Sequence, residues 1–148
     1  MDTILLSIFY FRQIYGFCIT MFIKSCFSLC SMDLVACLTT GKGTWGHVSR
    51  LIADQEWENI YLITNEFGKE NFTPAKKANF VLVDTRRGTE ELRDEIKNQL
   101  KGFLKGTELA VNLVSGTGKE HMAVLSALLQ LGFGVRFLAL TKDGIKEI

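Results

Sequence analysis

The chain has 148 residues, a length that suits one domain and leaves no room for two full ones. Seventeen Lys and Arg against sixteen Asp and Glu give a net charge of +1, which argues against a generally basic nucleic-acid coat and against long nucleic acid as a partner. With 47% hydrophobic residues, 22% charged residues and a single Pro, the composition excludes disorder as a description of the whole chain.

The first 31 residues differ in composition from the rest, since they hold only three charged residues but three of the four Cys. One interpretation is that translation begins at Met32. A membrane anchor is the second, although Arg12 interrupts its apolar stretch. A secretory signal is the third, although the segment lacks a clear basic start and cleavage site. We favour a start at Met32 and a domain over residues 32–148. Because that domain holds only Cys37, no disulfide framework is implied, and we expect a cytoplasmic protein without membrane contact.

From Met32 onward, short apolar runs alternate with helical periodicity. The pattern predicts six strands, over residues 34–38, 60–63, 80–83, 109–114, 135–140 and 145–148. It predicts longer helices over 45–55, 89–105 and 119–131, and a short helix over 73–77 between the second and third strands. Strands of this kind, alternating with helices, are typical of a parallel sheet covered on both faces. The sequence therefore predicts an α/β fold: a three-layer, doubly wound, mostly parallel sheet of order 3-2-1-4-5 with a short C-terminal hairpin strand.

Two Gly-rich loops should meet where the winding of this sheet reverses, between the first and fourth strands. The loops are Thr39-Thr40-Gly41-Lys42-Gly43-Thr44 and Ser115-Gly116-Thr117-Gly118-Lys119. Gly lets a backbone approach a ligand closely, while helix N-termini and Lys attract anions. The pattern predicts a phosphate or nucleotide site. The alternative is that these Gly residues only form tight turns.

Two common phosphate-binding motifs do not fit these loops. In a Walker A alignment, Glu120 takes the Ser/Thr position and Leu113 the first Gly position, which argues against magnesium-triphosphate hydrolysis. Gly41, Gly43 and Gly46 have the spacing of a dinucleotide fingerprint, but Gly46 falls where a helix should already have begun. A nicotinamide dehydrogenase is therefore a weak interpretation.

His47 and His121 lie one turn into the helices that follow the two loops. Each can contact a ligand or transfer a proton, or can be an ordinary partly exposed helix residue, which we favour for His47. No cluster of His, Cys and carboxylates suggests a metal, and we expect no cofactor. The helix over 119–131 offers mainly Ser126 and Gln130 as polar positions, so we expect it to pack against a second copy of the chain.

The sequence around the second loop resembles the signature of CRISPR-associated Rossmann-fold (CARF) domains, in which a strand leads through a Gly- and hydroxyl-rich turn with a Lys into an apolar helix. The passage is Val111-Asn112-Leu113-Val114-Ser115-Gly116-Thr117-Gly118-Lys119-Glu120-His121-Met122. The Gly/Thr loop after the first strand and the closing segment 135–148 are also similar, so the resemblance covers most of residues 32–148. It implies a Rossmann-like fold and a homodimer that binds cyclic oligoadenylates in a groove. Some standalone members, the ring nucleases, cleave that ligand by directing a ribose 2′-hydroxyl at the adjacent phosphate.

Under this hypothesis the two loops supply both the ligand-binding and the catalytic residues. The ligand-binding residues would be Thr40, Gly41, Lys42, Gly43, Thr44, Gly116, Thr117 and Gly118, and the catalytic residues would be Lys119, Ser115 and His121. Such cleavage needs no metal, because in-line placement and charge stabilisation supply the rate. The alternative is a noncatalytic ligand-binding or regulatory module that acts with a partner protein. Residues 32–148 carry no effector domain, which favours the enzyme.

Overall fold

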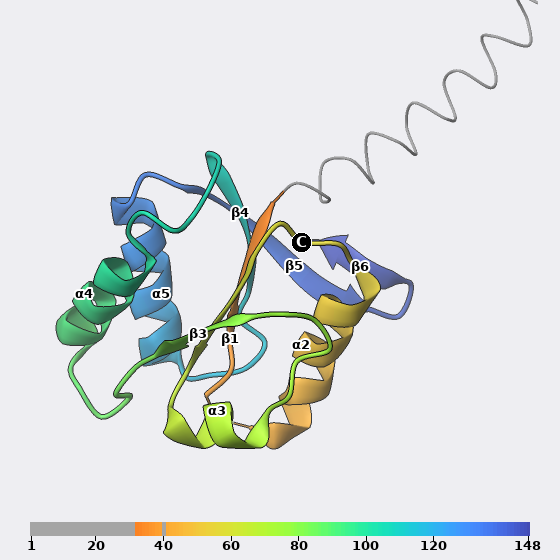
Figure 1. The fold of residues 1–148 in the computed structure, drawn as a ribbon, viewed down its shortest axis with the longest axis horizontal. Coiled ribbons are helices and arrows are strands. Elements are labelled where there is room, and N and C mark those ends of the chain that lie inside the picture. The colour runs from red at the N-terminus through yellow and green to blue at the C-terminus, as the bar shows by residue number, and fades with distance from the viewer. Residues whose placement is uncertain (1–31, 40) are drawn as a thin grey trace, which may run out of the picture.

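The computed structural model describes residues 32–39 and 41–148, which form a six-stranded sheet of order β3-β2-β1-β4-β5-β6 (Figure 1). The strands are β1 (Asp33–Cys37), β2 (Ile60–Thr64), β3 (Asn79–Leu82), β4 (Glu108–Asn112), β5 (Gly134–Thr141) and β6 (Gly144–Glu147). All neighbours pair in parallel except β5 and β6, which form a hairpin. The predicted α/β class, strand order and hairpin are confirmed.

Helices cover both faces of the sheet, with α4 (Thr89–Leu100) and α5 (Gly118–Gln130) on one side and α2 (Lys42–Asp54) on the other (Figure 1). The short helix α3 (Glu66–Asn71) follows β2 at the carboxyl edge of the sheet. The sheet therefore has two apolar cores. Alternate residues of β1 belong to different cores, because successive side chains of a strand point to opposite faces: Val35 packs toward α4 and α5, and Leu34 toward α2.

The first helix starts earlier than predicted. Helix α2 begins at Lys42 rather than at Trp45, so Lys42, Gly43 and Thr44 form its first turn. Gly41 precedes it with a left-handed φ of 77°, and its carbonyl accepts hydrogen bonds from both the amide and the hydroxyl of Thr44. This local turn ends the loop and starts the helix three residues before the apolar spacing becomes visible.

The predicted helix over 73–77 was wrong, and α3 forms before it instead. The Asn65 side chain accepts a hydrogen bond from the Gly68 amide at 2.9 Å, which caps the start of α3. Gly68 is required there, because a Cβ would lie 2.0 Å from Thr64 Oγ1 and 2.7 Å from the Leu38 carbonyl oxygen. Polar residues dominate this short helix, so it has no apolar stripe that the sequence could reveal.

Two other elements end earlier than predicted. Helix α4 stops at Leu100 rather than at 105, and the chain turns at Gly102, whose φ is 84°. Strand β4 stops at Asn112 rather than at 114. The Asn112 side chain donates to the Leu138 carbonyl at 2.7 Å and accepts from the Val114 amide at 3.3 Å, which turns the chain out of the sheet.

The expectations for residues 1–31 and for Thr40 concern positions outside the described part of the chain. Within residues 32–39 and 41–148, no helix combines the length and the apolar character needed to cross a membrane.

Candidate functional site

The two Gly-rich loops lie side by side, as predicted, because β1 and β4 are neighbours in the sheet and pair in register up to Ala36 and Asn112. Gly116, in the second loop, has a left-handed φ of 111°. A Cβ at this position would lie 2.7 Å from Cys37 Sγ and 2.9 Å from His121 Nε2. Only Gly fits there without displacing a neighbour, so the second loop packs closely against the end of β1, the strand that leads into the first loop.

The start of α5 is fixed by a capping box. Thr117 Oγ1 accepts from the Glu120 amide at 3.4 Å, and Glu120 Oε2 accepts from the Thr117 amide at 2.7 Å. The following first-turn amides, those of Gly118 and Lys119, have no intrahelical acceptor in any α-helix. With the helix dipole they favour an anion at this end of α5.

A buried hydrogen bond joins the first loop to the first turn of α5. The Thr39 hydroxyl, which follows β1, donates to Glu120 Oε2 at 2.5 Å, and both residues are buried. In the sequence, Glu120 stands out only as a departure from the Walker A pattern. Its role was not visible because its partner lies 81 positions away along the chain.

The two Lys residues of the predicted site both have partners. Lys119 Nζ donates to the carbonyl oxygens of Thr85 at 2.6 Å and Arg87 at 2.9 Å, both in the loop between β3 and α4. Lys42 Nζ lies 4.8 Å from the centre of the Phe67 ring, which is a cation–π distance. The ammonium groups therefore face the side of the site toward β2 and β3.

The remaining candidates differ in exposure. Ser115 is 1% exposed. His121 is half-buried, and its Nε2 lies 3.0 Å from the Ser115 carbonyl oxygen. His47 is exposed on α2, as an ordinary helix residue would be. Of the three residues predicted as catalytic, His121 and Lys119 are the two that are partly accessible in this arrangement.

A cavity of about 470 Å³ opens beside the two Lys residues, at the carboxyl ends of β2 and β3. Its lining is Asn65, Glu66, Phe67, Leu82, Val83, Asp84, Thr85, Arg86 and Glu95. Two of these residues are the partners of Lys42 and Lys119, namely Phe67 and Thr85, so the cavity adjoins the predicted site. Hydrogen bonds from the side chain and backbone of Arg86 lower the pKa of Asp84 to about 2, so this carboxylate is ionised at neutral pH.

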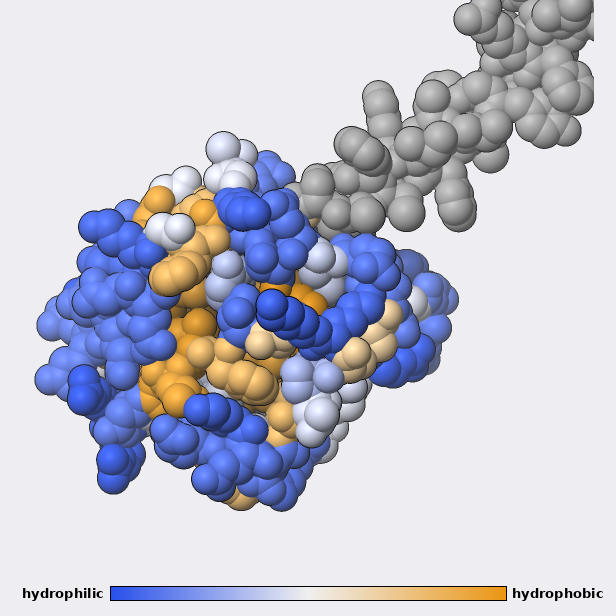
Figure 2. Space-filling model, viewed as in Figure 1, coloured by the Kyte–Doolittle hydropathy of each residue, from blue (hydrophilic) through white to orange (hydrophobic). Residues whose placement is uncertain are grey.

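The cavity could not be predicted from the sequence, because its walls come from three separate segments. Beside it, β3 is the edge strand of the sheet and leaves Phe80 and Leu82 only half-buried. Figure 2 shows hydrophobic residues over this part of the surface, between hydrophilic surfaces on both sides.

The residues described above form a Rossmann-like α/β domain whose two Gly-rich loops meet at the switch point of the sheet. Among residues 32–39 and 41–148, no three His, Cys, Asp or Glu side chains are placed to share a metal ion. No protein-family model matches the chain, and no curated protein matches its sequence.

Proposed function

We propose that this domain binds a phosphate-containing nucleotide at the switch point between β1 and β4, with a cyclic oligoadenylate as the candidate ligand. The observation that carries the proposal is the position of the two Gly-rich loops. They follow the neighbouring strands β1 and β4, each leads into a helix and carries a Lys, and a cavity of about 470 Å³ adjoins them. Helix N-termini and ammonium groups favour phosphate, and a cavity of this size accommodates a base.

In this proposal the phosphate contacts come from Lys42, Lys119 and the amides of Gly43 and Gly118. The base enters the cavity, where the exposed Phe67 ring offers a stacking surface. Lys119 would exchange its carbonyl partners for phosphate oxygens, because a hydrogen bond from an ammonium group to an anion is stronger than one to a neutral carbonyl.

Ring-nuclease chemistry would proceed without a metal. The ribose 2′-oxygen attacks the adjacent phosphorus and the bond from phosphorus to the 5′-oxygen breaks. The 5′-oxygen takes a proton from solvent, so the products carry a 2′,3′-cyclic phosphate and a 5′-hydroxyl. The His121 imidazole can take the 2′-hydroxyl proton, and Lys119 can stabilise the charge that develops on the phosphate oxygens. Ser115 is buried, so it supports the loop in this state rather than presenting its hydroxyl to a ligand.

The second candidate function is a noncatalytic binding module that acts with a partner protein. The observation in its favour is that the His121 ring is already hydrogen-bonded to the Ser115 carbonyl. A ring held in this way has one nitrogen fewer for proton transfer. We place either form in the cytoplasm, because the one Cys of the described residues, Cys37, is a free, buried thiol.

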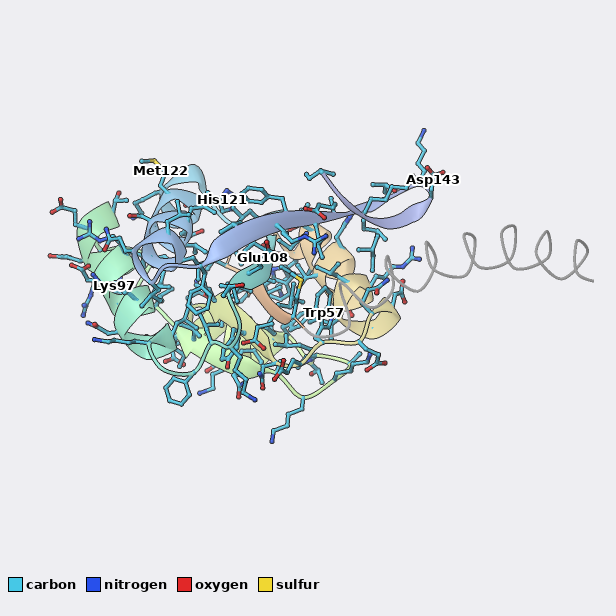
Figure 3. All side chains as sticks on the ribbon, turned by 90° about the horizontal axis from the view of Figure 1, so that it is seen from above. Trp57, Lys97, Glu108, His121, Met122 and Asp143 are labelled. Atoms are coloured by element: carbon cyan, nitrogen blue, oxygen red, sulfur yellow. The ribbon has the colours of Figure 1, made fainter. Side chains whose placement is uncertain are left out.

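A homodimer is part of the proposal. Met122 and Leu129 are seven positions apart on α5 and are 66% and 61% exposed, and Val114 and Ile148 are also exposed. Figure 3 shows Met122 projecting outward from α5. An apolar helix stripe that residues 32–39 and 41–148 leave uncovered favours packing on the same stripe of a second copy.

The test is to mix the protein with cyclic tetra-adenylate, measure binding by calorimetry and follow the products by chromatography. Linear products carrying a 2′,3′-cyclic phosphate support the ring nuclease. Tight binding without products over a long incubation supports the module. If the protein does not bind, the cyclic-oligoadenylate assignment is wrong.

A further inference from the structure

The Glu120 carboxylate accepts a hydrogen bond from one residue of each loop of the proposed site. It lies on the first turn of α5 and is 3% exposed. One oxygen, Oε2, accepts from the Thr39 hydroxyl at 2.5 Å and from the Thr117 amide at 2.7 Å. Because a buried carboxylate needs hydrogen-bond donors, the loop after β1 and the start of α5 must keep this relative position to satisfy it.

The hydrogen bonds around Glu120 run in one direction. Thr39 donates its single hydroxyl proton to Glu120 Oε2. The Thr39 oxygen can then only accept from the Cys37 thiol, which lies 3.8 Å away. Burial, and secondly the charge of Glu120, raise the pKa of Cys37 to about 12, so the thiol keeps the proton that this contact needs. The Cys37 thiol therefore donates to the Thr39 oxygen and the Thr39 hydroxyl donates to Glu120, and these two contacts hold the Thr39 hydroxyl in one orientation.

The second loop packs directly on this chain of hydrogen bonds. A Cβ on Gly116 would lie 2.7 Å from Cys37 Sγ and 3.0 Å from Glu120 Oε2. A shift of Cys37 or of the Glu120 side chain would consequently move the backbone at Gly116, which lies just before the first-turn amides of α5. A capping residue alone would not connect the two loops, since its contacts stay within its own helix.

We infer that Glu120 is a positioning residue, which through Thr39 holds the two Gly-rich loops at the separation that a phosphate group needs to contact both. The inference rests on the proposed function. Thr39 follows β1, whereas Glu120 lies in α5. The inference therefore predicts that loss of the Thr39 hydroxyl lowers the affinity for a ligand by weakening its contacts with the start of α5 as well as those with the start of α2.

The experiment compares Thr39→Val, which removes the donor, with Thr39→Ser, which keeps it, in the full chain. Thr73→Val, an exposed loop position, controls for the exchange of Thr for Val. Cyclic tetra-adenylate affinity is measured by calorimetry, and amide hydrogen exchange is measured without ligand over residues 41–44 and 115–119. We expect Thr39→Val to lower affinity about ten-fold and to speed exchange in both segments. Thr39→Ser should restore both readouts, and Thr73→Val should change neither.

A double-mutant comparison distinguishes loss of the Thr39–Glu120 hydrogen bond from general destabilisation of the fold. If Thr39 acts through Glu120, Thr39→Val combined with Glu120→Ala should weaken binding no more than Glu120→Ala alone, whereas additive losses would overturn the inference. Unchanged exchange over 115–119 in Thr39→Val would also overturn it, whether or not the ligand binds. Failure of the wild type to bind the probe would instead refute the proposed function, so the two failures are distinguishable.

Discussion

Lys119 holds two backbone carbonyls of the loop between β3 and α4, those of Thr85 and Arg87. From the sequence, this residue is a cation in the first turn of a helix, where it opposes the dipole and adds nothing to stability. The contacts change that expectation, because the ammonium group also holds one wall of the cavity.

Lys119→Ala should therefore affect both binding and folding. We expect ten- to a hundred-fold weaker nucleotide binding, from the loss of one charge-assisted contact of about 1.5–3 kcal/mol. We also expect a loss of about 1 kcal/mol of stability, or roughly 4 °C in melting temperature. Calorimetry and thermal melting measure the two, with the exposed Lys142 replaced by Ala as the control. Unchanged affinity would remove Lys119 from the site and leave Lys42 as the main phosphate contact.

Cys37 should be unreactive while the protein is folded. Its pKa of about 12, against 9.0 for an ordinary thiol, comes first from burial and then from the charge of Glu120. At pH 9 the folded thiol is therefore protonated, whereas the unfolded thiol is half ionised. We expect iodoacetamide at pH 9 to leave Cys37 unmodified in buffer and to alkylate it in urea, as read by peptide mass spectrometry. Rapid alkylation in buffer would show that the interior around β1 opens readily.

The raised pKa of Cys37 also sets a dependence of stability on pH. Because the folded state favours the protonated thiol, its contribution to stability is full below pH 9. It is lost as the pH rises from about 9 toward 12, the two pKa values of the unfolded and folded states.

Helix α3 depends on a close contact with the sheet at Gly68. Gly68→Ala would place a methyl group 2.0 Å from Thr64 Oγ1, so we expect a loss of about 1–3 kcal/mol in the free energy of unfolding. Gly46→Ala is the matched control, because Gly46 lies inside α2 with no atom near its Cβ position. That change should stabilise the protein by about 0.5–1 kcal/mol. Urea unfolding compares the two, and equal effects would contradict the packing described for α3.

The elements that the sequence predicted are those whose pattern is local. Strand β1 is apolar from Leu34 to Cys37 and is buried on both faces, and the apolar stripe of α4 recurs at helical spacing over Leu92, Ile96 and Leu100. The prediction extended α4 too far because Phe103 and Leu104 continue that spacing. The structure turns at Gly102 and leaves Phe103 exposed.

The candidate site was predictable only in part. The two loops could be placed together, because strand order follows from the alternation of strands and helices, and the order fixes which carboxyl ends are neighbours. The contacts within the site depend on partners that are remote in sequence. The Thr39–Glu120 hydrogen bond, the carbonyl partners of Lys119 and the cavity beside Phe67 arise only once the chain has folded.

At the scale of the whole molecule, the apolar stripe on α5 should mediate a two-fold dimer. Met122→Glu and Leu129→Glu should each weaken association at least ten-fold, because each places a charge in an apolar contact. Lys77→Glu, in the exposed loop before β3, is the control and should leave association unchanged. Light scattering at high micromolar concentration measures the mass, and a monomeric wild type would contradict the dimer.

The central place of β1 has a consequence for synthesis on the ribosome. Asp33 pairs with Leu109 on one side, and Leu34 pairs with Ile60 on the other. A nascent chain that has reached β3 therefore has β1 paired on one side only, with an open edge where β4 will later add. Such unpaired edges are where nascent chains associate wrongly. The core around β1 can be fully packed only after β4 and α5 have left the ribosome. Ribosome-bound chains that end before Glu108 should therefore require chaperone binding, whereas chains that extend to Ile148 should not.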